Sequence, residues 1–323
     1  MGVFNLTLTQ MLVMFVLMLT GYILKKGNFI PDNSSAVISK VLAFVLAPAL
    51  TLNNQIANCT PKTFSENSQL IIYGLVAVLI AVGISYPLSA LFVRNKNKSP
   101  ELAYQRQIYK YALTFGNFSY MGNYIVLGIW GDVMLFKYTM FTFIMNIVVF
   151  IWGIYILVPK SADSRGILSN LKAGLLTPAF ISLVLGMVIG LTGLSQYVPT
   201  FLTSSLNNAG GCMGPMAMLL AGIVIGEYKF SELLKNKKIY IVTFLRLIVI
   251  PAVFVSVLKF LNISHDIIVV MLIAYATPMG LNTVVFPAAY GGDTRTGASM
   301  TMISTILSIA TIPLMYYIFA VLL

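Results

Sequence analysis

The chain has 323 residues, of which 59% are hydrophobic and only 9% are charged. A soluble domain carries about 25% charged residues, so the composition excludes a soluble fold and predicts an all-α, polytopic membrane protein that crosses the lipid bilayer. The net charge of +11 comes from basic residues between apolar runs, which favours membrane topology and anionic lipid as its explanation and gives no reason to expect nucleic acid.

Apolar runs long enough to cross a bilayer repeat along the chain, and we count ten of them. They cover residues 7–25, 36–56, 69–93, 107–130, 134–158, 174–193, 200–226, 239–261, 266–290 and 296–322. The loops after even-numbered spans hold only Lys62, Lys137 and Lys259, whereas most of the 20 Lys and Arg residues follow odd-numbered spans. This asymmetry predicts a multi-pass protein of the plasma membrane, with the odd loops in the cytoplasm and both termini outside.

Five spans per half place the second half upside down relative to the first. Residues 1–158 hold the first five spans and residues 174–323 the second five, and short features recur in the same order in both. The matched features are Pro31 and Pro48 with Pro199 and Pro215, Pro87 with Pro251, and Trp130-Gly131-Asp132 with Gly291-Gly292-Asp293. The sequence therefore predicts a 5+5 inverted repeat, a recurring plan of secondary transporters.

Spans 4 and 9 are interrupted in the middle. Span 4 contains the run 115–123, and span 9 contains Pro278, Gly280 and Asn282 within residues 276–282. Proline removes a backbone donor and glycine adds conformational freedom, so both helices should break. An unsatisfied peptide group in hydrocarbon costs several kcal/mol, so such a break is tolerated only where it faces protein or water. We expect the two broken helices to cross near the midplane.

Two helix N-termini that face each other would make a small anion site, because each carries roughly half a positive charge and unpaired N–H groups. Unwound carbonyl groups could hold a cation instead. For each asparagine taken alone, capping of the interrupted backbone is the more common role. The candidate substrate-binding residues are Asn117, Ser119, Gly122, Asn123, Thr277, Pro278, Gly280, Asn282, Thr283 and Arg246.

Charged residues inside spans are few. Snorkelling to the interface explains Lys40, whereas Arg246 either snorkels or faces a cavity. No Asp or Glu lies at mid-membrane, which excludes a proton relay of the paired-aspartate type. Coupling to Na⁺ or to H⁺ stays open, and a sodium site would have to use Asn, Ser, Thr and carbonyl oxygens. We expect no cofactor and no bound metal.

Two further patterns have ordinary explanations. Small residues four apart at Gly186/Gly190, Gly210/Gly214 and Gly222/Gly226 permit close helix contact, either within the chain or between two copies. The Met, Phe and Tyr residues are interpreted as apolar filling and interfacial aromatics.

Pro278, Asn282 and the run 291–293 resemble the C-terminal signature of the auxin efflux carrier family, which includes bacterial malate-permease-like members. Gly116-Asn117 and Gly122 are similar to its N-terminal counterpart, and Arg246 with Pro251 resembles its pattern in span 8. Ser119 and Asn123 depart from that family's usual glycine and proline. The resemblance implies organic-anion substrates, usually a homodimer, a scaffold (7–56 and 174–226) and a mobile transport domain (69–158 and 239–323).

These patterns favour a secondary transporter that moves a small organic anion, a dicarboxylate or an auxin-like carboxylate, by alternating access. A non-transporting ligand-binding receptor or sensor and an anion channel are the alternatives. An enzyme is excluded by the single histidine and by the lack of a nucleophile–base pair or metal spacing at depth.

Overall fold

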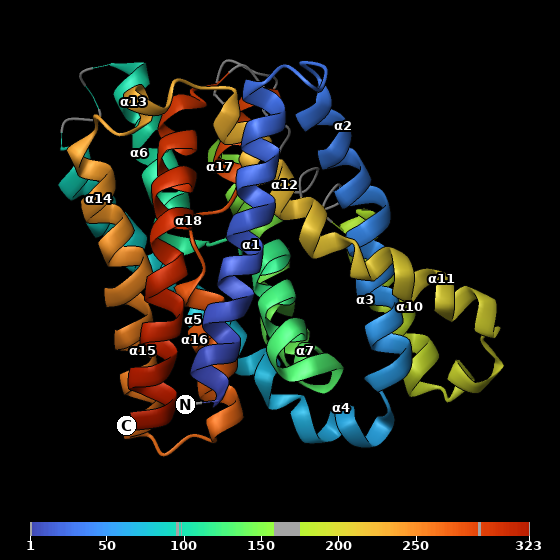
Figure 1. Cartoon of the computed structure of the whole chain (residues 1–323). Helices are drawn as coiled ribbons and strands as arrows, with labels where there is room; N and C mark the ends of the chain where they lie inside the picture. Colours follow the sequence, from blue (N-terminus) through green and yellow to red (C-terminus); the bar gives the residue numbers. More distant parts are fainter. Residues whose placement is uncertain (1, 95–96, 98, 158–174, 290–291, 323) are drawn as a thin grey trace.

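The computed structural model describes residues 2–94, 97, 99–157, 175–289 and 292–322. Within these residues all regular structure is helical, apart from one isolated antiparallel bridge between Gly116 and Met279 (Figure 1). Seven helices are long and apolar enough to cross a membrane, and two shorter apolar helices cover Pro178–Leu191 and His265–Ala276. An all-helical membrane protein is thereby confirmed, and the division into ten spans stays a prediction.

The helices follow one another with short links. In the first half they are α1 (Gly2–Lys26), α2 (Ser34–Val41), η1 (Leu42–Leu46), α3 (Ala47–Asn58), α4 (Pro61–Asn67), α5 (Gln69–Phe92), α6 (Pro100–Thr114), η3 (Phe118–Gly122), α7 (Asn123–Val148), η4 (Val149–Gly153) and α8 (Ile154–Leu157). In the second half they are α10 (Pro178–Leu191), η5 (Leu194–Tyr197), α11 (Thr200–Gly211), α12 (Met213–Gly226), α13 (Phe230–Leu233), α14 (Lys237–Phe244), η6 (Leu245–Val249), α15 (Ile250–Phe260), α16 (His265–Ala276), α17 (Asn282–Ala289), α18 (Arg295–Tyr316) and η7 (Tyr317–Leu322).

Several sequence predictions fall on residues outside the described ranges. They are the boundary residues 158, 174 and 323, Gly291 of the C-terminal signature and the predicted end of span 9 at residue 290. Asp293, the last residue of the signature, is described. Its carboxylate accepts hydrogen bonds from the backbone N–H of Arg295 at 2.9 Å and from the Thr296 hydroxyl at 2.6 Å, so it caps the start of α18.

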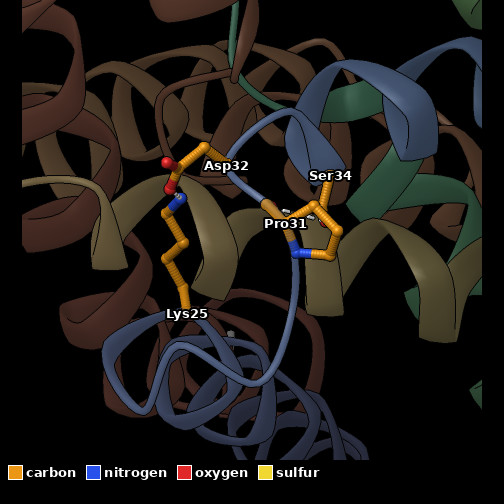
Figure 2. A network of polar contacts seen from close by, with 4 residues as sticks. All are labelled: Lys25, Pro31, Asp32 and Ser34. Carbon is orange, nitrogen blue, oxygen red and sulfur yellow. Dashed lines mark hydrogen bonds and ion pairs between the residues drawn. The ribbon is translucent and has the colours of Figure 1, made fainter.

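The link between α1 and α2 is a tight polar turn. Lys25 Nζ lies 2.6 Å from Asp32 Oδ1, and the Ser34 hydroxyl donates to the Pro31 carbonyl at 2.7 Å (Figure 2). The hydrogen bond from the Lys25 ammonium holds the pKa of the Asp32 carboxyl below its ordinary value. This turn reverses the chain at the end of the molecule opposite the two termini, which lie together (Figure 1).

Two prolines inside spans, Pro48 and Pro251, are preceded by wider helical turns. The π-helical turn η1 comes just before Pro48, and η6 comes just before Pro251. Proline lacks the N–H that would bond the carbonyl four residues earlier, and a π turn is one way in which a helix absorbs that loss. The turn η6 therefore has a local cause in Pro251, and it contains Arg246.

A second local irregularity lies inside α7 at Gly131, whose φ is 76° and ψ is −169°. A residue with a Cβ rarely adopts this conformation, so glycine is needed for the sharp change of direction. The kink falls where the sequence predicted the link between spans 4 and 5.

Glycines allow close packing within a first group of helices, formed by α1, α3, α10 and α12. A Cβ on Gly21 would lie 2.1 Å from the Leu219 carbonyl oxygen, and one on Gly222 would lie 1.8 Å from that of Met18, so α1 and α12 touch backbone to backbone. Gly190 meets the Cys59 carbonyl oxygen in the same way at 2.4 Å. The paired glycines of the sequence thus contact other helices of the same chain.

The second group packs α5 against α6 and α7, and α16 against α15 and α18. Gly74 of α5 would place a Cβ 1.9 Å from the Phe141 carbonyl oxygen of α7. In Figure 1, α16 and the short α17 lie next to α18, with α6 behind it. This group contains both interrupted helices.

Candidate functional site

The first interruption separates α6 from η3. Ser99 caps the start of α6 by accepting from the Leu102 N–H at 3.2 Å, and Pro100 occupies the first turn. The helix ends at Thr114, and Phe115 is extended, with φ −116° and ψ 129°. Helical hydrogen bonding resumes when the Asn117 carbonyl accepts from Met121 N at 3.0 Å and from Gly122 N at 3.1 Å. The break therefore covers residues 115–117.

The second interruption separates α16 from α17. Thr277 is extended, with φ −62° and ψ 145°, as expected of a residue that precedes proline. The Met279 N–H donates to the Ser304 hydroxyl of α18 at 2.9 Å. The Gly280 carbonyl accepts from both the N–H and the hydroxyl of Thr283, at 3.1 and 2.9 Å, which starts the next helix. This break covers residues 277–281.

The two breaks are bonded to each other. Gly116 and Met279 form an antiparallel bridge, and the Asn117 N–H donates to the Pro278 carbonyl oxygen at 2.6 Å. A Cβ on Gly280 would lie 3.2 Å from the Gly116 carbonyl oxygen, so the two backbones are in direct contact. Peptide groups that lost their helical partners thus find partners across the pair, as a low-dielectric interior demands.

Arg246 lies against both breaks and is fully buried. Its Nη1 donates to the Thr114 carbonyl at 3.4 Å and its Nη2 to the Ala274 carbonyl at 3.5 Å. Its guanidinium carbon lies 5.4 Å from the centre of the Tyr275 ring. Its Nε has no hydrogen-bond partner among the described residues. Snorkelling, one of the two sequence-based interpretations of Arg246, is therefore wrong.

Tyrosine side chains complete the surroundings of the breaks. Asn282 Nδ2 donates to the hydroxyl of Tyr111 at 2.8 Å, which connects the start of α17 to α6. The Tyr138 hydroxyl donates to the Phe118 carbonyl at 2.9 Å, and a Cβ on Gly122 would lie 2.1 Å from that hydroxyl. Tyr111, Tyr138 and Tyr275 are all buried.

The remaining predicted residues lie in the breaks or in the first turns after them. Ser119 and Asn282 are partly exposed, whereas Asn117, Asn123, Thr277 and Thr283 are buried. The Asn117 side chain makes no capping hydrogen bond, and that of Asn282 bonds Tyr111. The capping role considered for Asn117 is therefore wrong.

Tyr111, Tyr138 and Ser304 were not predicted. The tyrosines were interpreted as apolar filling, but hydroxyls of two of them bond groups at the interruptions. Ser304 belongs to a polar row on the otherwise apolar last span, with Thr301, Ser304 and Ser308 three or four residues apart. That spacing is the signal that could have found Ser304.

Comparison with known proteins shows the family of the chain. Residues 6–316 match the model of a family described as membrane transport protein. The chain belongs to the membrane transport protein family. It is 23% identical over 320 residues to the uncharacterized transporter YfdV of Escherichia coli (strain K12), with 96% of each chain covered. It is 22% identical over 309 residues to the uncharacterized transporter MJ1031 of Methanocaldococcus jannaschii, covering 94% of this chain and 96% of that one. The predicted resemblance to auxin efflux carriers is confirmed at the level of the family.

In this membrane transport protein, the charges next to the breaks are that of Arg246 and the partial charges of the helix ends. No Asp or Glu occurs between Glu101 and Asp132 or between Asp266 and Asp293. The ends of α6 and α16 contribute roughly half a negative charge each, and the starts of η3 and α17 contribute roughly half a positive charge each. Arg246 contacts carbonyl groups at the negative ends of α6 and α16.

Proposed function

We propose that the chain is a secondary carrier that moves a small organic anion, a dicarboxylate or an auxin-like carboxylate, across the plasma membrane by alternating access. The observation that carries this proposal is the direct bond between the two helix interruptions, Asn117 N–H to the Pro278 carbonyl oxygen at 2.6 Å. It supports a crossing of spans 4 and 9 in which the helix starts at Phe118 and Asn282 lie close together. Two such N-termini without a nearby carboxylate favour an anionic ligand.

The 5+5 inverted repeat is part of the proposal. One interruption falls in each half of the chain, and both termini lie at the same end of the molecule (Figure 1), as an even number of crossings requires. The basic loops lie in the cytoplasm in this arrangement, and both termini lie outside.

The division into a scaffold and a mobile transport domain rests on the close packing within each group of helices. Backbone contacts at Gly21 and Gly222 support a rigid scaffold of 7–56 and 174–226, and the contact at Gly74 supports a second rigid unit of 69–158 and 239–323.

We also propose that two copies form a homodimer through the scaffold. Four polar side chains of α11 are exposed although α11 belongs to a helix that can span the membrane: Ser204, Ser205, Asn207 and Asn208. Polar groups facing lipid are costly, and a second copy would cover them. Cross-linking of purified protein in liposomes tests the dimer.

Uptake into proteoliposomes tests the carrier. Purified protein should accumulate at least one member of a panel of radioactive malate, related dicarboxylates and indole-3-acetate, measured with and without sodium and at two pH values to identify the coupling ion. Asn282→Ala and Asn117→Ala should abolish uptake without loss of folded protein. Asn146→Ala removes only a bond to the Thr142 carbonyl within α7 and should transport like the native chain.

Two results would reject this function. The first is the finding that no organic anion in the whole panel is transported by the protein or stabilises it. The second is full uptake by both Asn117→Ala and Asn282→Ala. Single-channel conductance steps in planar bilayers would instead indicate an anion channel.

A further inference from the structure

We infer that Arg246 is a built-in counter-ion, that is, a positioning residue whose fixed positive charge holds the negative ends of the two interrupted helices together. The positive ends of the two helices can then bind the anion. The inference rests on the proposed function only for its transport measurement. It assigns Arg246 a role distinct from direct contact with the substrate.

The burial of Arg246 is the first reason. Its side chain is 0% exposed, and neither of the ion pairs found among the described residues involves it. A buried, unpaired cation is very costly, so something must compensate its charge. In the part of the chain that the structure describes, the hydrogen-bond acceptors of its terminal nitrogens are the backbone carbonyl oxygens of Thr114 and Ala274.

The identity of these carbonyls is the second reason. Thr114 is the last residue of α6, and Ala274 is in the last turn of α16. The final carbonyls of a helix lack intrahelical partners, and each helix end carries roughly half a negative charge. Two such ends match one guanidinium in magnitude, and the two nitrogens of its fork reach one helix each.

The space around the guanidinium is the third reason. A Cβ on Gly116 would lie 2.5 Å from Arg246 Nη2 and 2.7 Å from the Thr277 carbonyl oxygen. The guanidinium therefore contacts the first break directly, beside the backbone of the second. The face of the Tyr275 ring adds a further attraction for the cation. Arg246 thus occupies the position in which a bound cation would join the two helix ends.

Removal of this charge should expose the anion to two negative helix ends. Arg246→Met keeps an apolar side chain in the space but removes the charge, and it should raise the KM for the transported anion about tenfold with a smaller change in the maximum rate. Lys40→Ala removes an exposed cation of α2 and should leave KM unchanged.

A second measurement needs no anion. Arg246→Ala should lower the melting temperature of purified protein, and guanidinium at concentrations too low to denature the protein should restore part of the loss, whereas choline, which is too large, should not. The native chain and Lys40→Ala should show no such gain. A purely structural loss of packing would not create this cation dependence.

The outcomes separate this inference from the proposed function. Absence of guanidinium rescue, or an unchanged KM in Arg246→Met, overturns the counter-ion role even if transport is demonstrated. Failure of the native chain to transport any anion rejects the proposed carrier function. The rescue of Arg246→Ala by guanidinium would still test the counter-ion role. If the Arg246→Ala and Arg246→Met proteins cannot be produced in folded form, Arg246→Lys distinguishes the outcomes. A folded Arg246→Lys protein supports a role for the positive charge, and failure of that variant to fold overturns the counter-ion role.

Discussion

Substitution of Gly116 by alanine tests whether direct contact between the two breaks holds the site together. The new methyl group would lie 2.5 Å from Arg246 Nη2, 2.5 Å from the Thr277 hydroxyl and 2.7 Å from the Thr277 carbonyl oxygen. The arginine nitrogen can move, but the carbonyl oxygen belongs to the backbone of the second break. An ordinary contact of about 3.4 Å requires a displacement of about 0.7 Å.

That displacement is comparable with the tolerance of the bond between the breaks. Asn117 N and the Pro278 carbonyl oxygen are 2.6 Å apart, so a shift of about 0.7 Å lengthens this bond beyond the usual range of hydrogen bonds. Overpacking of a tight interior costs typically 1–3 kcal/mol, and a kcal/mol shifts the melting temperature of a larger domain by roughly 2–4 °C. We therefore expect a melting temperature lower by roughly 2–12 °C, together with a large loss of transport.

The assay is thermal unfolding of purified protein in detergent, followed by uptake into proteoliposomes. Gly83→Ala is the matched control, because Gly83 lies inside α5 with no atom within 4 Å of the added methyl group. Alanine in a helix interior is favoured over glycine by roughly 0.5–1 kcal/mol, so Gly83→Ala should unfold at or above the native temperature. A Gly116→Ala protein that melts and transports like the native chain would refute the reasoning.

Two further substitutions test other parts of the structure. Ser304→Ala leaves the buried N–H of Met279 without its partner and should cost about 1–3 kcal/mol in thermal unfolding, whereas Ser308→Ala loses only a bond to the Thr305 carbonyl within α18 and should cost less. Gly222→Ala places a methyl group 1.8 Å from the Met18 carbonyl oxygen and should separate α12 from α1. The expected result is a loss of folded protein on size-exclusion chromatography. The control Gly211→Ala adds a methyl group with no atom within 4 Å and should remain folded. Equal stability within either pair would contradict the corresponding contact.

The position of the second break could be predicted from the sequence because its cause is local. Pro278 lacks an N–H and forces Thr277 into an extended conformation, and this holds in any fold. The pairing of Gly116 with Met279 has no local cause. It depends on how helices far apart in the sequence pack, and composition or periodicity does not contain that information.

The role of Arg246 shows the same limit. Whether a basic side chain in a span reaches the interface or turns inward depends on its direction around the helix. Here that direction is set in a π turn that precedes Pro251, and an extra residue in a turn rotates the side chains relative to an ordinary helix. Hydropathy treats Arg246 and Lys40 alike, yet the first is fully buried and the second is exposed.

The bonds between the breaks also limit where motion can occur in the proposed carrier. Spans 4 and 9 share a backbone hydrogen bond and an antiparallel bridge, and separation of these in a dry interior would leave peptide groups unsatisfied at a cost of several kcal/mol each. The crossing should therefore move as one body.

The weaker contacts join α3 to α7, where Gln55 Nε2 donates to the Thr139 hydroxyl at 2.9 Å and Asn54 Nδ2 to the Asp132 carbonyl at 3.0 Å. Each of these amides keeps a buried oxygen without a partner among the described residues, so this contact is not fully satisfied in the present arrangement. An interface of side-chain bonds that is incompletely satisfied can exchange partners at lower cost than a backbone bridge, and it lies between the two groups of helices that alternating access requires to slide.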